Sequence, residues 1–300
     1  MARKFRNGER HAGITSGRRF REAVSAYVLL APALVIFGFF AFWPLWRLIH
    51  YALHQQNNNG TRERYVGFSQ ITDTLTGSEF RQGLGVNLKF LVFTVPLGVT
   101  LGLLLAVAAH RRLRGIKFFQ TVFSSTVASS VAVSAVVFFT LVNPNVGFFQ
   151  DVTWLRLDRP LSALFAVCLS SVWRNLGVTF VIVLAGLQAV PDEIIEAATL
   201  DGYGPVRRFF KITVPLISPT LLFLAVVLTV DALQAFAQME LLTGGGPGGS
   251  TETILYKITK LTNPRDFGTG AAMSLGLFVL TAIVAAAQFG VLNRRVHYGE

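Results

Sequence analysis

The sequence predicts an all-α membrane protein that crosses the bilayer six times, from its composition and from the lengths of its apolar stretches. Of the 300 residues, 52% are hydrophobic and only 14% are charged, and the mean hydropathy is +0.52. Soluble domains carry about 25% charged residues, so this chain is too apolar to be one. Six stretches are each long enough to span a hydrocarbon core of roughly 30 Å as a helix. These predicted spans are 26–52, 84–109, 118–142, 161–188, 216–240 and 269–292.

The same pattern divides the chain into three parts. Residues 1–24 are a basic N-terminal arm, residues 25–295 are the six-helix membrane domain, and residues 296–300 are a short tail. A basic arm before an apolar stretch also occurs in signal sequences, but here no small-residue cleavage site follows, so we expect a retained span. The polar segment 55–83 is predicted to lie outside the cell, with one small helix around Ser69 to Thr76.

Basic residues determine the predicted orientation of the spans. The formal net charge is +11, and Lys and Arg are concentrated in the segments that alternate spans place on one side. Positive charge favours the cytoplasmic side, so both termini are expected in the cytoplasm. The basic residues assigned to that side are Arg3, Lys4, Arg6, Arg10, Arg18, Arg19, Arg21, Arg111, Arg112, Arg114, Lys117, Arg207, Arg208, Lys211, Arg294 and Arg295. This bias and attraction to the lipid membrane explain the net charge, so no nucleic acid is expected as a partner.

The segment 190–219 is the most informative part of the chain, because it places a short polar pair of helices between two apolar spans. It reads VPDEIIEAATLDGYGPVRRFFKITVPLISP. Pro191 suits a first helical position, and the two acidic residues behind it place negative charge where the helix dipole favours it. Gly202 suits the end of this helix, and Pro205 suits the start of a second one. Helices this short do not fold alone, so the adjoining spans and a docked protein must hold them.

This segment resembles the EAA motif of permease subunits in bacterial ATP-binding-cassette importers. The matching residues are Glu196, Ala197, Ala198, Asp201, Gly202, Ile212 and Pro215. Around it, SVWRNLG, AGLQAVP and TGGGPGGSTETILYKI resemble the carbohydrate-type importers of that superfamily. Within that group, GYGPVRRFFKITVPLISP and QFGVLNRRVHY are most similar to the first of the two permeases of glycerol-3-phosphate or glycerophosphodiester importers.

The resemblance implies the type I importer permease fold and a division of labour among subunits. A second permease, expected to be a different chain, completes the pathway through the bacterial cytoplasmic membrane. Two ATPase subunits use ATP and Mg, and an extracytoplasmic binding protein delivers the solute, whereas this chain binds no cofactor itself. The cytoplasmic loop 190–215, called the coupling loop below, then seats on the ATPase. Its expected contact residues are Glu196, Ala197, Ala198, Asp201, Gly202, Arg207 and Arg208.

Small residues in the coupling loop and in a second, glycine-rich loop are predicted to have different roles. In the coupling loop, Ala197 and Ala198 are small enough for a partner to approach closely, and Gly202 permits a sharp turn. The glycine cluster from Gly244 to Gly249 lacks the lysine of a phosphate-binding loop and falls on the external side. We therefore expect a flexible external loop there that contacts the binding protein.

Polar and ionisable residues within the predicted spans mark a candidate translocation path, because such residues are costly in lipid. The candidates are Arg174, Asn175, Asp231, Gln234 and Gln238, with Lys89 as a second possible attractor of an anionic phosphate. The last three of the five share one face if the fifth span is a continuous helix. Two interpretations carry equal weight: a polar clamp or Arg174–Asp231 ion pair that fixes helix packing, or residues that the substrate passes.

Other classes of protein fit the sequence less well. A membrane enzyme needs a constellation such as HExxH or two facing acids, and a passive channel needs no coupling helix. The scattered histidines do not suit a metal site, and Cys168, which is the single cysteine, lies inside a predicted span. An importer of di- or oligosaccharides is the main alternative for the substrate.

Overall fold

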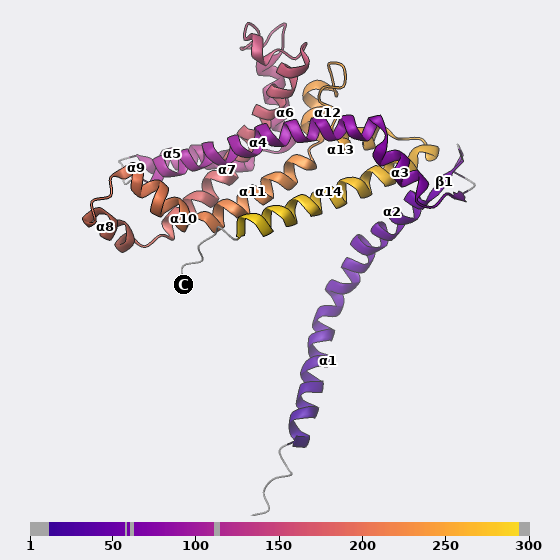
Figure 1. Cartoon of the computed structure of the whole chain (residues 1–300), viewed down its shortest axis with the longest axis horizontal. Coiled ribbons are helices and arrows are strands. Elements are labelled where there is room, and N and C mark those ends of the chain that lie inside the picture. Colours follow the sequence, from indigo (N-terminus) through magenta and orange to yellow (C-terminus); the bar gives the residue numbers. More distant parts are fainter. Residues whose placement is uncertain (1–11, 58, 61–62, 111–114, 294–300) are drawn as a thin grey trace, which may run out of the picture. The chain divides into compact units, whose positions relative to one another are not determined.

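The computed structural model describes residues 12–57, 59–60, 63–110 and 115–293. Its internal contacts divide the chain into two units, Met1–Tyr51 and Ala52–Glu300, and each is described by itself. The described residues of both units are mostly helical, as the sequence predicts (Figure 1).

The first unit is a long helix with little internal packing. It contains α1 (Ala12–Phe37), a π-helical stretch over Gly38–Phe42, and most of α2 (Trp43–Leu53). The first candidate span runs over Val24–Leu53 with a mean hydropathy of 2.2, close to the predicted limits. Because α1 begins at Ala12, the second half of the predicted basic arm is helical rather than a separate segment. The first half of the arm lies outside the described residues.

The second unit begins with the predicted external segment. A two-stranded antiparallel hairpin forms from β1 (His54–Gln56) and β2 (Glu63–Tyr65), with His54 opposite Tyr65. This hairpin is a small departure from the predicted all-helical chain. It is followed by α3 (Ser69–Thr76), which coincides with the small helix that the sequence predicts.

Three further spans are single helices whose limits lie near the predicted ones. They are α4 (Ser78–His110), α7 (Pro160–Gln188) and α14 (Phe267–Asn293). α4 and α7 pack closely because small residues let their backbones approach, as is usual for helices in lipid. A Cβ at Gly102 of α4 would overlap Thr179 Cγ2 of α7 and lie 2.8 Å from Thr179 Cβ.

The predicted span 118–142 is bent rather than straight. α5 (Ile116–Ser125) and a 3-10 turn over Thr126–Ala128 meet α6 (Val131–Val142) at an angle of 105°. Ser130 starts the new helix, since its hydroxyl accepts a hydrogen bond from Val133 N at 3.2 Å. Figure 1 shows the result, with α6 and α12 projecting from the side of α4 and α7.

The predicted span 216–240 is also not one helix. The segment Pro205–Leu216 meets α11 (Ser218–Leu233) at 68°, with Ile217 at the bend. Prolines on both sides of Ile217 lack the N–H that would continue the helical hydrogen bonds, which explains the break. A second break after Leu233 separates α11 from α12 (Ala237–Thr243). With each bent pair counted as one span, the described chain has up to six.

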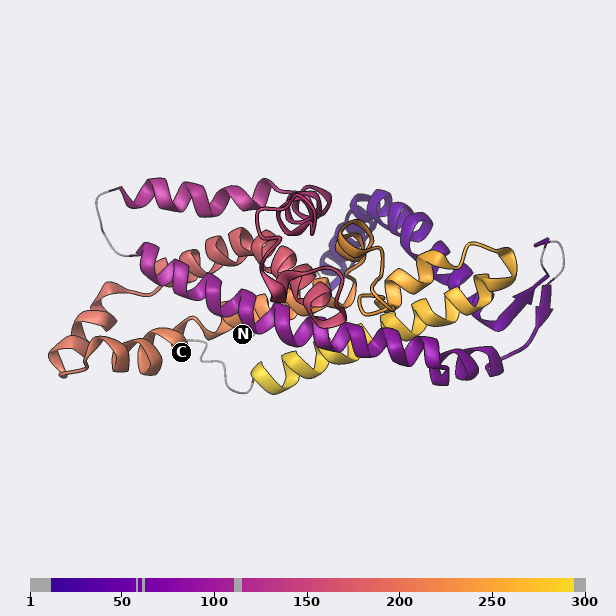
Figure 2. The same cartoon turned by 90° about the horizontal axis from the view of Figure 1, so that it is seen from above.

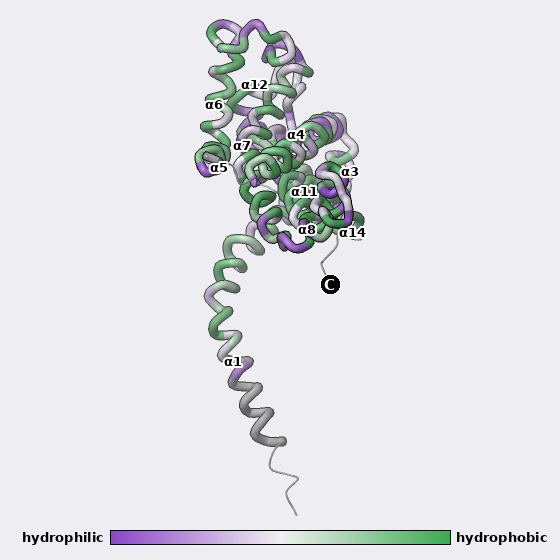
Figure 3. Tube along the Cα trace, turned by 90° about the vertical axis from the view of Figure 1, so that its left-hand side faces the viewer, coloured by the Kyte–Doolittle hydropathy of each residue, from purple (hydrophilic) through white to green (hydrophobic). Residues whose placement is uncertain are grey.

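The remaining elements connect these spans. They are the 3-10 turn Thr153–Leu155, α8 (Asp192–Leu200), α9 (Pro205–Arg208), the π-helical stretch Phe209–Thr213, α10 (Val214–Leu216), α13 (Ile254–Lys260) and the 3-10 turn Pro264–Asp266. In the second unit α8 lies at one end of the long helices and α3 and β1 at the other (Figures 1 and 2). Hydrophobic residues cover most of α6 and α11, as expected for helices in lipid (Figure 3).

Replacing a glycine within a helix by alanine usually stabilises the protein, and we predict the opposite at the α4–α7 contact. Gly102→Ala should destabilise the protein by roughly 1–3 kcal/mol, the usual cost of overpacking, because the fully buried Thr179 cannot move aside. Gly85→Ala in the same helix is the matched control, since nothing lies within 4 Å of a Cβ there. That variant should be neutral or gain up to about 1 kcal/mol. The check is thermal unfolding of the purified protein, and equal midpoints for both variants would contradict the prediction.

Candidate functional site

The coupling loop folds into two short helices joined by a tight turn. α8 begins directly after Pro191, one residue later than predicted, and its first turn carries Asp192 and Glu193. At its end, Gly202 adopts φ +79° and Gly202 N donates to Thr199 O at 3.1 Å. Pro205 then opens α9 as predicted. The positive φ explains why glycine occupies the turn, since an L side chain is strained in that conformation.

α8 presents a mixed apolar and acidic surface to its surroundings. Leu200 is 89% exposed, and Glu196 and Ala197 are exposed beside it. Neither Glu196 nor Asp201 has an ion-pair or hydrogen-bond partner for its carboxylate among the described residues. Ala198 differs from the prediction, because its side chain is only 4% exposed and packs into the loop itself. A partner protein can therefore contact the side chain of Ala197 but not that of Ala198.

The two arginines of the loop are held by contacts within it. The guanidinium of Arg207 lies 4.8 Å from the centre of the Tyr203 ring, a cation–π distance. Arg208 donates to the hydroxyl of Thr199, which ties α9 back to α8. Arg208 therefore braces the loop, whereas the unpaired carboxylates of Glu196 and Asp201 are left for other contacts.

A second group, called the polar cluster below, consists of Arg174, Asn175 and Asp231. Arg174 Nη2 donates to both carboxylate oxygens of Asp231, at 2.8 and 2.7 Å, and Asn175 Nδ2 donates to Asp231 Oδ2 at 3.0 Å. The side chain of Arg174 is 17% exposed and that of Asp231 is 39% exposed. The Arg174–Asp231 ion pair considered from the sequence thus forms between α7 and α11. Arg174 Nε is buried without a partner, so one donor is left over.

The structure separates the other predicted path residues from this cluster. The break after Leu233 ends the helical spacing, so Gln234 and Gln238 do not share a continuous helical face with Asp231. Gln234 is exposed, and Gln238 is only 3% exposed and packed inside the protein. Lys89 lies on the exposed side of α4. The predicted polar face of the fifth span is therefore wrong beyond Asp231.

Sequence reasoning missed Asn87, which is fully buried in α4. Its amide donates to Leu233 O at 3.0 Å and Ala232 O at 3.4 Å, and its oxygen accepts from Ile254 N at 2.9 Å. One side chain thus joins the end of α11 to the start of α13. A lone asparagine within an apolar span was the available signal, because lipid cannot satisfy its hydrogen bonds.

A second missed residue is Gln288 in α14. Gln288 Nε2 donates to Thr229 Oγ1 at 2.8 Å, and Thr229 is fully buried in α11. Gln288 Oε1 is buried and has no partner. This contact ties the last span to α11 two residues before Asp231.

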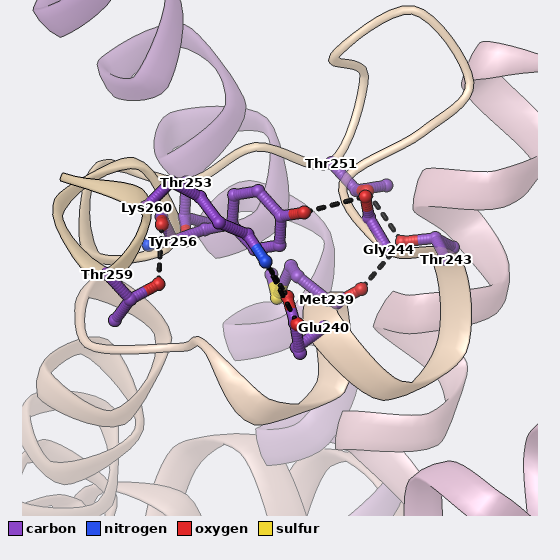
Figure 4. A network of polar contacts seen from close by, with 9 residues as sticks. All are labelled: Met239, Glu240, Thr243, Gly244, Thr251, Thr253, Tyr256, Thr259 and Lys260. Atoms are coloured by element: carbon purple, nitrogen blue, oxygen red, sulfur yellow. Dashed lines mark hydrogen bonds and ion pairs between the residues drawn. The ribbon is translucent and has the colours of Figure 1, made fainter. Parts of the chain in front are cut away.

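The glycine cluster forms an ordered turn, not the flexible loop predicted. Figure 4 shows Tyr256 reaching the turn, where its hydroxyl donates to Gly244 O at 2.6 Å. The hydroxyls of Thr243 and Thr251 lie 2.6 Å apart, and Thr253 Oγ1 donates to Ala235 O at 2.8 Å. Polar contacts therefore fix the turn to the end of α11 and to α13.

Ion pairs secure the same region from outside. Lys260 Nζ lies 2.9 Å from both carboxylate oxygens of Glu240. Figure 4 shows this pair. Lys257, which is not drawn there, pairs with Glu79 and Glu252. Burial acts to lower the pKa of Lys257, but its hydrogen bonds to the two carboxylates outweigh burial and hold the pKa above 10.5. Lys257 therefore stays charged at physiological pH.

No group of three or more metal-binding side chains occurs in the part of the chain that the structure describes. Cys168 is a buried, free thiol within α7. The Cys168 side chain packs inside the helix bundle.

Long apolar helices with an exposed polar helix pair at one end are typical of a polytopic membrane protein. The family described as "Binding-protein-dependent transport system inner membrane component" matches residues 98–298, which is more than half of the chain. The chain belongs to this family and is thus a non-catalytic permease component of an importer in the inner membrane. The all-helical membrane fold predicted from the sequence is thereby confirmed.

Curated relatives cover nearly the whole chain. The sn-glycerol-3-phosphate transport system permease protein UgpA of Rhizobium meliloti is 33% identical over 93% of this chain and 98% of its own length. The UgpA proteins of Agrobacterium fabrum and Escherichia coli O157:H7 are 32% and 33% identical, also over 93% of this chain. The resemblance stated from the sequence is confirmed by these relatives.

Solved structures show the same fold. A chain of the crystal structure of a bacterial alginate ABC transporter, in complex with its alginate pentasaccharide-bound periplasmic protein, has a TM-score of 0.78. It is 20% identical, and the match covers 92% of this chain and 96% of that chain. At this identity the likeness extends to the fold alone.

We predict that Arg174 and Asp231 stabilise the protein as a pair. Asp231→Leu or Arg174→Leu alone leaves a charge without its partner and should cost roughly 2 kcal/mol, less than a fully buried pair because Asp231 is partly exposed. The double variant, which removes both charges, should be more stable than either single variant. Thermal unfolding of the four proteins gives the coupling energy, and strictly additive losses would contradict a paired role.

Proposed function

We propose that this chain is one of two permease subunits of an ATP-driven importer for glycerol-3-phosphate or glycerophosphodiesters. The observation that supports it most strongly is the match to three UgpA proteins, each named for sn-glycerol-3-phosphate transport, at 32–33% identity. The match covers 97–98% of their lengths, so the likeness extends over nearly the whole of each relative.

The proposed complex contains four further components. A second permease, expected to differ from this one, completes the pathway. Two cytoplasmic ATPase subunits bind ATP and Mg and supply the energy, so this chain needs no cofactor of its own. An extracytoplasmic binding protein selects the solute. In the proposed orientation both termini and α8 are cytoplasmic, and α3 and β1 lie outside. The positions of α8 at one end of the second unit and of α3 and β1 at the other are compatible with this orientation (Figure 1).

The coupling loop is proposed to seat on the ATPase. Leu200 and Val206 are 89% and 71% exposed beside the acidic residues of the loop, and exposed apolar groups with polar neighbours suit a protein contact. Glu196 and Asp201 add two carboxylates that can pair across the interface. The loop continues through Ile217 into α11, so its displacement reaches Asp231 along one run of helices.

A glycine comparison tests the coupling role. Gly202→Val should uncouple ATP hydrolysis from transport, because φ +79° is strained for a β-branched residue by roughly 1–3 kcal/mol and the turn that aims α8 must change. Gly204→Val is the matched control, since φ there is −63° and both glycines face open space. The measurement is the ratio of solute imported to ATP hydrolysed in reconstituted vesicles. An unchanged ratio for Gly202→Val, with normal insertion, would refute the coupling role.

The polar cluster is proposed to line the translocation path. Arg174 keeps one unpaired donor, Nε, beside the partly exposed carboxylate of Asp231. A phosphate group entering there would compete with Asp231 for Arg174. The neutral double variant Arg174→Leu, Asp231→Leu separates the two interpretations of this pair. If the double variant is more stable than the single variants but does not take up solute, the result supports a path role. If it takes up solute like the wild type, the pair serves helix packing instead.

The substrate is tested by transport in vesicles that contain this chain with its neighbouring permease, ATPase and binding protein. We expect ATP-dependent uptake of radiolabelled glycerol-3-phosphate or glycerophosphocholine but not of a disaccharide. Uptake of the disaccharide alone would assign the chain to a sugar importer. Flux without ATPase would instead indicate a channel, and substrate conversion by the isolated chain would indicate an enzyme.

A further inference from the structure

An open, mostly apolar cleft lies between α4 and the start of α7, apart from both sites described above. Its volume is about 640 Å³, within the range of roughly 300–1,000 Å³ that holds small molecules. Phe93 of α4, Trp154 of the preceding loop and Phe165 of α7 line it. The ring of Phe165 meets the other two edge-on, with centroids 6.1 and 5.4 Å apart. Phe93 and Trp154 are 41% and 56% exposed, so the described residues of the second unit leave this aromatic surface uncovered.

The cleft lies at the end of α7 away from α8, which is the end of a candidate span and so is expected near a membrane surface. α7 begins at Pro160, and Phe165 is in its second turn. Trp154 is amphipathic, with an apolar ring and one N–H, and such rings prefer the membrane–water interface. With the cytoplasmic position of α8 given by the proposed function, the cleft opens to the outer leaflet.

Arg159 lines this cleft, and among the described residues its guanidinium is not committed to an ion pair. Its neighbour Arg156 is committed, because Arg156 Nη2 and Nε donate to the two oxygens of Asp158 at 2.6 and 3.1 Å. Arg159 lines the cleft and has no ion-pair partner in the described part of the chain. Ser162 Oγ donates to the backbone oxygens of Arg156 and Arg159, at 2.6 and 3.2 Å, and holds this part of the loop in place.

A second cation lies on α4 beside the residues that line the cleft. Lys89 is exposed on α4, one turn before Phe93, and residues four apart share a helix face. It too has no ion-pair partner among the residues that the structure describes. Two positive charges thus flank an apolar slot.

We propose that this cleft binds one phospholipid of the outer leaflet. The phosphate lies between Arg159 and Lys89, and an acyl chain lies along Phe93, Trp154 and Phe165. A soluble phosphate would use only the two cations and leave the aromatic slot empty, whereas a lipid uses both. Anionic lipids are favoured over zwitterionic ones, because the head group then meets the positive charges of Arg159 and Lys89.

Native mass spectrometry of the assembled importer tests this site. The complex is delipidated in detergent and titrated separately with phosphatidylglycerol, phosphatidylethanolamine and soluble glycerol-3-phosphate. We expect one tightly retained phosphatidylglycerol per chain. Arg159→Gln and Lys89→Gln should each weaken its retention roughly five-fold, the effect of about one basic residue near an anionic head group. Arg265→Gln is the control, because it removes an exposed charge on the same side but outside the cleft, and should change nothing.

A blocking variant tests the apolar part of the site independently. Leu161 lines the cleft and is 69% exposed, so Leu161→Trp should fold normally and fill the slot. Retention should then be lost while the complex still elutes intact. Equal retention by wild type and all variants, no retained lipid in the assembled importer, or displacement of the lipid by glycerol-3-phosphate would overturn the proposal. Lipid retention is read without transport, so failure of the proposed substrate leaves this result unaffected.

Discussion

The broken end of α11 is the constraint on which the intramembrane part of the protein depends. Helices that end within hydrocarbon leave backbone groups without partners, at several kcal/mol each, unless the protein supplies them. Here Asn87 donates to the carbonyls of Ala232 and Leu233, and Thr253 donates to that of Ala235. Because these donors come from α4 and from the start of α13, satisfying one helix end brings three segments together.

This convergence also positions the polar cluster. Asp231 lies one residue before the first of the capped carbonyls, so the same contacts that secure the break fix the backbone carrying its carboxylate. α7 supplies Arg174 and Asn175 opposite it, and Gln288 of α14 bonds to Thr229 nearby. The bend at Ile217 separates this fixed region from the coupling loop. Under the proposed coupling role, a displacement of α8 passes through the bend at Ile217 and along α11. It then reaches Asp231, where hydrogen bonds from other segments hold the backbone in place.

The sequence predicts the spans well and the breaks poorly, for physical reasons. Apolar length alone locates a span, and a positive-φ glycine is readable from the turn it closes, as at Gly202. Hydropathy does not record whether an apolar stretch is straight, so the 105° bend before α6 and the break after Leu233 were missed. The break after Leu233 depends on a distant donor, Asn87 of α4. The burial of Ala198 was missed for a related reason, since a motif identifies a surface helix but not which face packs inward.

Arg174 and Arg159 are the same type of side chain, but their surroundings give them different roles. Both are associated with α7, roughly 22 Å apart at a rise of about 1.5 Å per residue. At membrane depth an unpaired guanidinium is costly, and Arg174 is bound by Asp231 and only 17% exposed. At the interface water and head groups solvate the charge, so Arg159 can remain unpaired beside an apolar cleft. The charge of Arg174 is neutralised by Asp231, so it stabilises helix packing unless another anion displaces the carboxylate. The charge of Arg159 has no ion-pair partner among the described residues, so a ligand can bind it directly.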